Sequence, residues 1–255
     1  MKRWNYSQAA EKNFWLNIFS NNQDVGSYKN INLSEIKSFA QKQLERFELS
    51  AKDLSDKNVW DIGCGPYGVN VGLVQINDAA SYVSIDPLID FYQQFGWFEG
   101  NKITLVQCKI ENLQDNTSQF STPDIIFSTN VIDHVDELQK SLMNISGCAN
   151  KDTRILVSVH SIYSFMKPFA RVLDYFDKPH PYHKTQKQWI TEFEKNELEV
   201  VICKSISIID DHPDFTFLNF IKKPSMRNLK RIISTMIMHT NYFVLKKKML
   251  VTNNV

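Results

Sequence analysis

Short apolar runs alternate with amphipathic segments through the middle of the chain. The runs are rich in Val, Ile and Leu, and the segments between them repeat apolar residues at helical spacing. This pattern predicts strands over 59–62, 82–86, 103–107, 124–128 and 154–160, and helices over 68–76, 88–95 and 136–149. Because strands that alternate with helices join by right-handed crossovers, we expect a doubly wound, mostly parallel sheet with helices on both faces.

Two amphipathic segments precede this alternation. Residues 9–19 predict a helix with Phe14 and Trp15 on its apolar face, either buried against the sheet or added as a lid over a site. A second helix starts near Ser34, whose hydroxyl can cap it.

The last third of the chain changes in both pattern and charge. A helix over 186–196 is followed by strands over 199–209 and 215–221, which a polar run separates as in a hairpin. Beyond them, apolar residues at helical spacing predict an amphipathic helix; they are Leu229, Ile232, Ile233, Met236, Ile237, Phe243 and Val244. After Asp214 the chain has eight Lys and Arg residues and no acid, whereas the preceding part has 21 cations against 28 acids. Such asymmetry favours a surface for anionic partners.

Composition narrows the class of protein. With 255 residues, 43% hydrophobic and 22% charged, the chain can bury a core without disulfides or a structural metal. No apolar run reaches the roughly 18 residues of a membrane span, and the basic start has no apolar stretch of a secretory signal behind it. The four cysteines are far apart in the sequence and form no CxxC motif, which favours reduced thiols. We therefore expect a cytoplasmic protein.

The most informative segment is the glycine-rich run from Asp61 to Gly68, which follows a predicted strand and precedes a predicted helix. Its glycines let the backbone turn tightly and approach a ligand, and Asp86, at the end of the next strand, can accept both hydroxyls of a ribose. Literally, the spacing matches the dinucleotide fingerprint, so an NAD(P)-dependent oxidoreductase is one hypothesis. However, a carboxylate at Asp61 would repel a pyrophosphate and attract a cation, and the fourth strand ends in polar residues, 128–135.

These residues together resemble the class I S-adenosylmethionine (SAM)-dependent methyltransferases, in their small-molecule branch. The resemblance covers about residues 35–210 and implies a Rossmann-like, seven-stranded sheet whose last strand is antiparallel. Together with the segments that flank this region, we expect three parts: an N-terminal helical cap over 1–33, a SAM-binding domain over 34–222 and a basic amphipathic tail over 223–255.

The resemblance implies a set of cofactor-binding residues. The first motif supplies Asp61, Gly63, Gly65 and Pro66, the ribose-binding acid is Asp86 with Pro87 beside it, and the remaining members are Ile110, Glu111 and Asn130. Many relatives carry an acid just before the adenine-flanking pair, and this chain has Lys109 there instead.

Methyl transfer from a sulfonium mainly requires the acceptor to be held in line, with a base if the acceptor is a hydroxyl. Three histidines near the carboxyl edge are candidate catalytic bases: His134, His160 and His183. Each could instead serve packing or capping. A pair of His180 and His183 has no supporting carboxylate pair, so we expect no metal site. Aromatic residues over 161–183 would either line an acceptor pocket or pack as a core connection.

The sequence thus favours a SAM-dependent methyltransferase that acts on oxygen of a small molecule or a glycan. Within the resembled family, base methylation uses proline-containing turns or a Pro-Cys nucleophile after the fourth strand, and both are absent here, so no nucleic acid is expected. A non-catalytic SAM-binding subunit is a further hypothesis. The basic tail either brings the protein to the inner membrane face, as a peripheral contact, or packs on the body or a second subunit.

Overall fold

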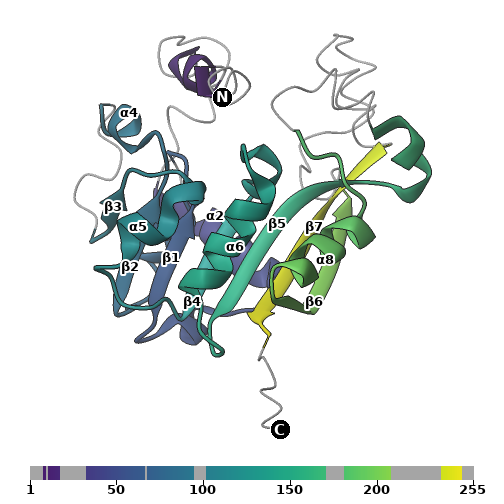
Figure 1. Ribbon diagram of the computed structural model, residues 1–255. Helices are drawn as coiled ribbons and strands as arrows, with labels where there is room; N and C mark the ends of the chain where they lie inside the picture. The colour runs from purple at the N-terminus through teal and green to yellow at the C-terminus, as the bar shows by residue number, and fades with distance from the viewer. Residues whose placement is uncertain are drawn as a thin grey trace, which may run out of the picture.

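The computed structural model describes residues 8–9, 11–17, 33–66, 68–94, 102–170, 181–207 and 237–248. It contains one seven-stranded sheet with the order β3-β2-β1-β4-β5-β7-β6, shown in Figure 1. The strands are β1 (Asn58–Ile62), β2 (Ser81–Ile85), β3 (Thr104–Val106), β4 (Ile125–Thr129), β5 (Arg154–Ile162), β6 (Leu198–Ser207) and β7 (Met238–Lys247). The first five are parallel, whereas β7 runs antiparallel to β5 and β6. The expected doubly wound fold, with an antiparallel last strand, is confirmed.

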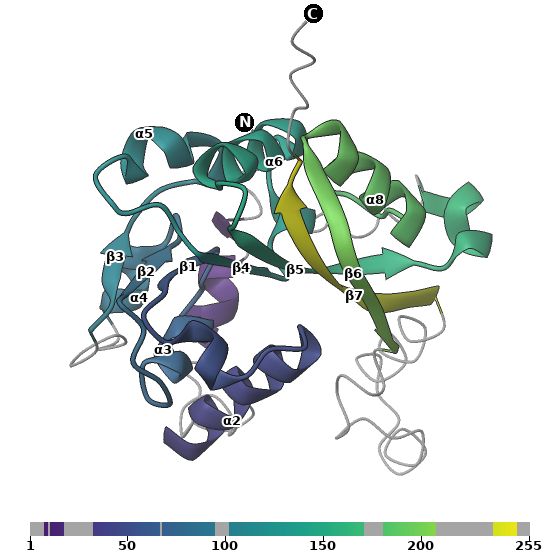
Figure 2. The same cartoon turned by 90° about the horizontal axis from the view of Figure 1, so that it is seen from below.

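Helices cover both faces of the sheet. Figure 2 shows α5 (Leu113–Thr117), α6 (Leu138–Cys148) and α8 (Gln186–Lys195) on one face, and α2 (Leu33–Arg46) and α3 (Val69–Leu73) on the other. The short helix α4 (Ile89–Gln93) follows β2. Turns of 3-10 helix complete the connections: η1 (Ala51–Leu54), η2 (Ile110–Asn112), η3 (Ile132–His134) and η4 (Ser164–Phe169).

Two apolar layers hold the sheet between its helices. One contains Leu142 of α6 and Trp189 and Phe193 of α8, and the other contains Leu44 and Phe47 near the end of α2. The central parallel strands, such as β1 and β4, are buried on both sides, which explains why they have continuous apolar runs rather than alternating ones.

The strand that pairs with β6 differs from the prediction. The expected partner over 215–221 lies outside the described residues, and the observed partner is β7, which the sequence analysis assigned to the amphipathic tail. Tyr242 packs into one apolar layer and Phe243 into the other, because successive side chains of a strand point to opposite faces. Residues 238–247 pair with β5 and β6 along their length, so the helical prediction for this part of the tail was wrong.

This correction moves the domain boundary. The sheet needs residues 238–247, so the domain does not end at residue 222. Two cations of the tail belong to β7 and have defined neighbours. Lys246 lies opposite Glu199 of β6, and the Lys247 ammonium donates to the Ala149 carbonyl oxygen at 3.3 Å. Lys222 to Arg231 lie outside the described residues. Within the described part of the chain, no helix has the length and apolar character needed to cross a lipid bilayer.

Candidate active site

A cavity of about 490 Å³ opens at the carboxyl ends of β1, β2 and β4. Its walls include Gly63 after β1, Asp86 after β2 and Asn130 after β4. The sheet order reverses at β1, which has β2 on one side and β4 on the other. Open α/β sheets bind ligands at such a switch point. The described residues that line the cavity are Gln8, Glu11, Phe14, Trp15, Gly63, Ile85, Asp86, Pro87, Cys108, Lys109, Ile110, Glu111, Asn130, Val131, His134 and Val135.

The turn after β1 depends on two glycines with left-handed backbone. Gly63 has φ +72°, and a Cβ there would lie 2.3 Å from Val131 Cγ1, so only glycine fits between the turn and the loop after β4. Gly65 has φ +56° and open space around its missing Cβ. The Gly63 N–H donates to the Ile85 carbonyl at 2.7 Å, which fastens the turn to the end of β2.

Asp86 connects this turn to the next helix. Its carboxylate accepts hydrogen bonds from the Gly65 N–H at 3.0 Å and the Leu88 N–H at 2.8 Å. The residue is 6% exposed and lines the cavity. Burial, and next the negative charge of Glu11, raise the pKa of Asp86 to about 7. A ligand that brings hydroxyl donors or positive charge would therefore stabilise the ionised form.

The N-terminal helix, seen in residues 8–9 and 11–17, supplies one wall of the cavity. The Tyr92 hydroxyl donates to Glu11 Oε1 at 2.9 Å, and the Trp15 ring meets the Tyr92 ring edge-on with 6.5 Å between centroids. Burial raises the pKa of Glu11. Trp15 was expected as a lid or as core, whereas Glu11 was missed. The sequence could have indicated Glu11, because it precedes Phe14 by three residues and Trp15 by four. Residues at these spacings lie on the same face of a helix.

Asp61 occupies a different place from the one expected. It does not line the cavity; its buried carboxylate accepts the Asn70 N–H at 3.3 Å, at the start of α3. A Cβ at Gly68 would lie 2.5 Å from Asp61 Oδ2. Burial raises the pKa of Asp61 to about 7. In this structure Asp61 supports the glycine turn from behind, and Gly65 and Pro66 also lie outside the described lining.

The far end of the cavity is shaped by Glu111, which caps the loop after η3. Glu111 Oε1 accepts the N–H groups of Asp136 and Glu137 at 3.0 and 3.1 Å. Asn130 has φ +57°, and its N–H donates to the Ser158 carbonyl oxygen at 2.9 Å, which ties the end of β4 to β5. These contacts fix the loop that carries His134.

The three candidate histidines separate in space. His134 lines the cavity, and its Nε2 lies 3.8 Å from Oδ1 of the buried Asp133. His160 lies on β5 with Nδ1 3.4 Å from Thr240 Oγ1, and it does not line this cavity. His183 is buried just before Thr185, the N-cap of α8. His180 lies outside the described residues, which contain no group of three or more His, Cys, Asp or Glu suited to a metal ion.

The residues around the cavity fit SAM. Gly63 lines the cavity without a side chain of its own, and the buried Asp86 carboxylate lies at the end of β2, where a ribose would be held. Asp86 and Glu11 provide a negative environment that suits a cationic sulfonium nucleoside better than a pyrophosphate. Lys109 also lines the cavity, but its one positive charge is outnumbered by the carboxyl groups of Glu11, Asp86 and Glu111 in the described lining.

Comparisons with known proteins agree with this geometry. Residues 33–202 match a family described as a methyltransferase domain. No curated protein sequence matches the chain. Among solved structures, a protein of Galdieria sulphuraria assigned as a sarcosine dimethylglycine methyltransferase superposes with a TM-score of 0.64 at 13% identity, over 94% of this chain and 98% of that one.

Two further structures share the fold at similar distance. One is phosphoethanolamine N-methyltransferase 2 of Haemonchus contortus, in complex with phosphomonomethylethanolamine and S-adenosylhomocysteine; its TM-score is 0.54 at 13% identity, over 89% of this chain and 60% of that one. The other is the cyclopropane synthase MmaA2 of Mycobacterium tuberculosis, with TM-score 0.53 at 13% identity, over 83% and 82%. The family match spans most of the sheet and excludes the oxidoreductase hypothesis. The chain belongs to the methyltransferase-domain family and is a SAM-dependent methyltransferase.

Proposed function

We propose that this enzyme methylates a hydroxyl oxygen of a small-molecule or sugar acceptor, with His134 as the general base. The observation that carries the proposal is the position of His134, which lines the cofactor cavity beside the buried carboxylate of Asp133. An acid next to a histidine orients the ring and stabilises the imidazolium that forms when it takes a proton.

The roles of the other residues follow from their places. SAM, when bound, supplies an electrophilic methyl group. Asp86 and Glu11 would hold the ribose end, and the glycine turn would let the backbone approach the nucleoside. Phe14 and Trp15 would exclude water from the same cavity. Water would then not compete with the acceptor hydroxyl for the methyl group.

One structural relative supports a small acceptor. The Haemonchus contortus structure holds the small molecule phosphomonomethylethanolamine, which supports the same size class here. A histidine base favours a hydroxyl acceptor, since a carboxylate or a thiolate has no proton to be removed.

The test is to identify the acceptor and then to replace the base. Incubation of labelled SAM with fractionated extract, followed by mass spectrometry, would identify the product. With that acceptor, His134→Asn should lower kcat by about 10²–10⁴-fold while the Kd for SAM changes little. The comparison variant is His160→Asn, on β5. If His160→Asn abolished turnover and His134→Asn did not, the assignment of the base would be wrong.

We also propose that the cations between Lys222 and Arg231 bring the enzyme to an anionic membrane at the cytoplasmic face, where a lipid-linked glycan could be its acceptor. Deletion of the whole tail would remove β7, so the charges alone should be changed. Replacement of Lys222, Lys223, Arg227, Lys230 and Arg231 by Gln should abolish binding to phosphatidylserine vesicles at low salt. Equal binding by both proteins would contradict the proposal.

A further inference from the structure

A second cavity, of about 330 Å³, opens at the other end of the same sheet edge. Its walls come from the end of β5, the first residue of α8, the end of β6 and the start of β7. Because β7 is antiparallel to both neighbours, its first residues meet the last residues of β5 and β6, as the pairs Ser161–His239 and Ser207–His239 show. This cavity therefore lies on the carboxyl edge, as the cofactor cavity does, and shares none of its described lining residues.

The described lining residues of this cavity include polar side chains but no charged ones. Its polar members are Tyr163, Ser164, Gln186, Ser205, Ser207 and His239, and no Asp, Glu, Lys or Arg occurs among the described lining residues. Burial lowers the pKa of His239, which keeps the ring neutral near neutral pH. A charged ligand would lose its hydration here without gaining a counter-charge, so the site favours an uncharged one.

Several groups in this lining have hydrogen-bonding capacity to spare. The amide of Gln186 donates from Nε2 to the Cys203 sulfur at 2.8 Å, which leaves its carbonyl oxygen as an acceptor toward the cavity. Ser164 lies at the exposed start of η4 with a hydroxyl that can donate and accept. The Ser205 hydroxyl donates to Asn241 Oδ1 and keeps its own oxygen available as an acceptor.

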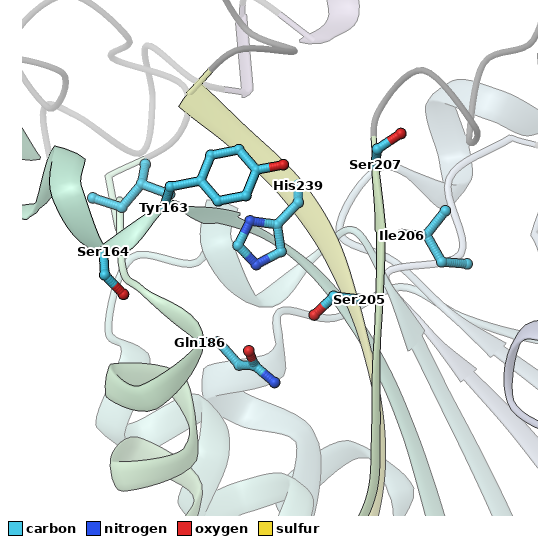
Figure 3. Close-up of a pocket in the computed structure, with 8 residues that line it drawn as sticks. Tyr163, Ser164, Gln186, Ser205, Ile206, Ser207 and His239 are labelled. Atoms are coloured by element: carbon cyan, nitrogen blue, oxygen red, sulfur yellow. The ribbon is translucent and has the colours of Figure 1, made fainter.

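The buried ring of His239 adds an unused group. Asn241 donates from Nδ2 to His239 Nε2 at 3.3 Å, so the neutral ring carries its proton on Nδ1. That nitrogen is buried and has no hydrogen-bond partner within the described residues. Figure 3 shows the His239 ring between Tyr163 on one side and Ser205 on the other. The His239 ring lines the cavity, but Nδ1 itself is shielded from solvent, so the ligand-binding groups are the exposed ones around it.

Aromatic rings complete the surface. Tyr163 packs on His239 with 4.7 Å between ring centroids, and it stacks on Phe165 with 5.9 Å and an interplanar angle of 7°. Phe165 is 66% exposed, so the stack ends in an open apolar face. Hydroxyl-binding groups beside an aromatic face match a ring that has hydroxyls around its rim and C–H bonds on its faces.

We propose that this second cavity binds a neutral, hydroxyl-rich ring, such as the sugar part of the methyl acceptor. The proposal rests on the proposed function for its link to methyl transfer, and it names the acceptor class more closely. The proposal is based on two observations. Tyr163, Ser164, Gln186 and His239 lie together at the carboxyl edge of the sheet, and the described lining residues include no charged side chain.

Ligand binding can be tested without SAM. Saturation-transfer NMR should detect at least one of the methyl α-glycosides of glucose, mannose and galactose at millimolar concentration, and should detect neither glucosamine nor glucuronate. Tyr163→Ala and Ser164→Ala should each weaken that binding by about fivefold or more. The matched control is Ser121→Ala, an exposed serine before the start of β4, which should bind as the wild-type protein does.

The outcomes separate this proposal from the proposed function. If no glycoside binds, or if the charged sugars bind equally well, the second cavity is not a neutral sugar site, even if His134 proves to be the base. If glycosides bind and Ser164→Ala raises KM for the identified acceptor without changing kcat, the cavity positions the acceptor. Glycoside binding that Tyr163→Ala and Ser164→Ala leave unchanged would place the sugar elsewhere and overturn the proposal.

Discussion

Gly63 and Gly65 share a left-handed backbone conformation but differ in what surrounds them. At Gly63 a side chain would collide with Val131, whereas at Gly65 it would meet no atom within 4 Å. The first glycine is therefore required by both backbone and space, and the second by the backbone alone. Sequence spacing identifies both residues but cannot separate these two reasons.

This difference predicts unequal effects of two similar substitutions. Gly63→Ala should lower the free energy of unfolding by about 2–5 kcal/mol, since left-handed strain and overpacking add. Gly65→Ala should cost only about 1–2 kcal/mol for the strain. Urea denaturation of both variants measures the two costs. Equal losses would mean that the turn relaxes away from Val131.

The carboxylates of Asp61 and Asp86 give the site its pH dependence. Burial is the main cause that raises the pKa of each to about 7, from the ordinary value of 3.8. Asp86 lines the cavity and should be ionised to accept ribose hydroxyls, whereas Asp61 lies behind the glycine turn and can act on the sulfonium only through its charge. The affinity for SAM should therefore rise from pH 6 to pH 8 and level off above pH 7. Below pH 7 the association constant should change by at most about tenfold per pH unit for each carboxylate. Calorimetric titration at several pH values measures this, and an affinity that does not change between pH 6 and 8 would contradict it.

The same two groups predict the opposite trend for the stability of the free enzyme. Their folded-state pKa values lie above the unfolded value, so the folded state binds more protons between about pH 4 and pH 7. The stabilisation from these groups is present below pH 4 and is lost as the pH rises through 7. Bound SAM should offset that loss, so the thermal shift caused by SAM should be larger at pH 8 than at pH 6.

At the scale of elements, the N-terminal helix couples to the end of β2 through the charge of Glu11. Because Glu11 raises the pKa of Asp86, Glu11→Gln should move the pH midpoint of SAM binding to a lower value. Glu45→Gln, on the exposed side of α2, is the matched control and should leave the midpoint unchanged. A midpoint that is the same in Glu11→Gln and in the wild-type enzyme would show that the helix does not contribute its charge to the site.

The last strand provides a test of the corrected domain boundary. Phe243 is fully buried between β5 and β6, so Phe243→Ala should reduce the free energy of unfolding by about 3–5 kcal/mol. Val201→Ala, on the exposed side of β6, should change it by about 0.5 kcal/mol or less. If Phe243→Ala were as mild as Val201→Ala, residues 238–247 would not be part of the core.

The elements differ in how well their sequence predicts them. The central parallel strands β1, β2 and β4 were predicted because burial on both faces makes each a short apolar run bounded by breakers. β7 was not predicted, because its first half contains the polar residues His239, Thr240 and Asn241 and it lies far along the chain from its partners. Seven apolar residues at helical spacing suggested a helix, and only pairing with β5 and β6, which local periodicity does not contain, decides for a strand.

At the scale of the whole molecule, the candidate chemistry gathers on one edge of the sheet. The ends of β1, β2 and β4 form the cofactor cavity, and the ends of β5 and β6 with the start of β7 form the second. Gly63, Asp86, Glu111, Asn130 and His134 were predicted for the first, because motif spacing places them at strand ends. Glu11 was not, since its place depends on how the N-terminal helix docks beside α4. The neutral cavity around His239 required the β7 pairing and could not be predicted from sequence.

The central claim is that the cavity between Gly63, Asp86 and Glu11 holds SAM. A crystal structure of the enzyme with S-adenosylhomocysteine tests it most directly. The account predicts the ribose hydroxyls on the Asp86 carboxylate, with the N-terminal helix over the nucleoside. A nucleoside bound instead beside Tyr163 and His239, with the Asp86 cavity empty, would contradict it.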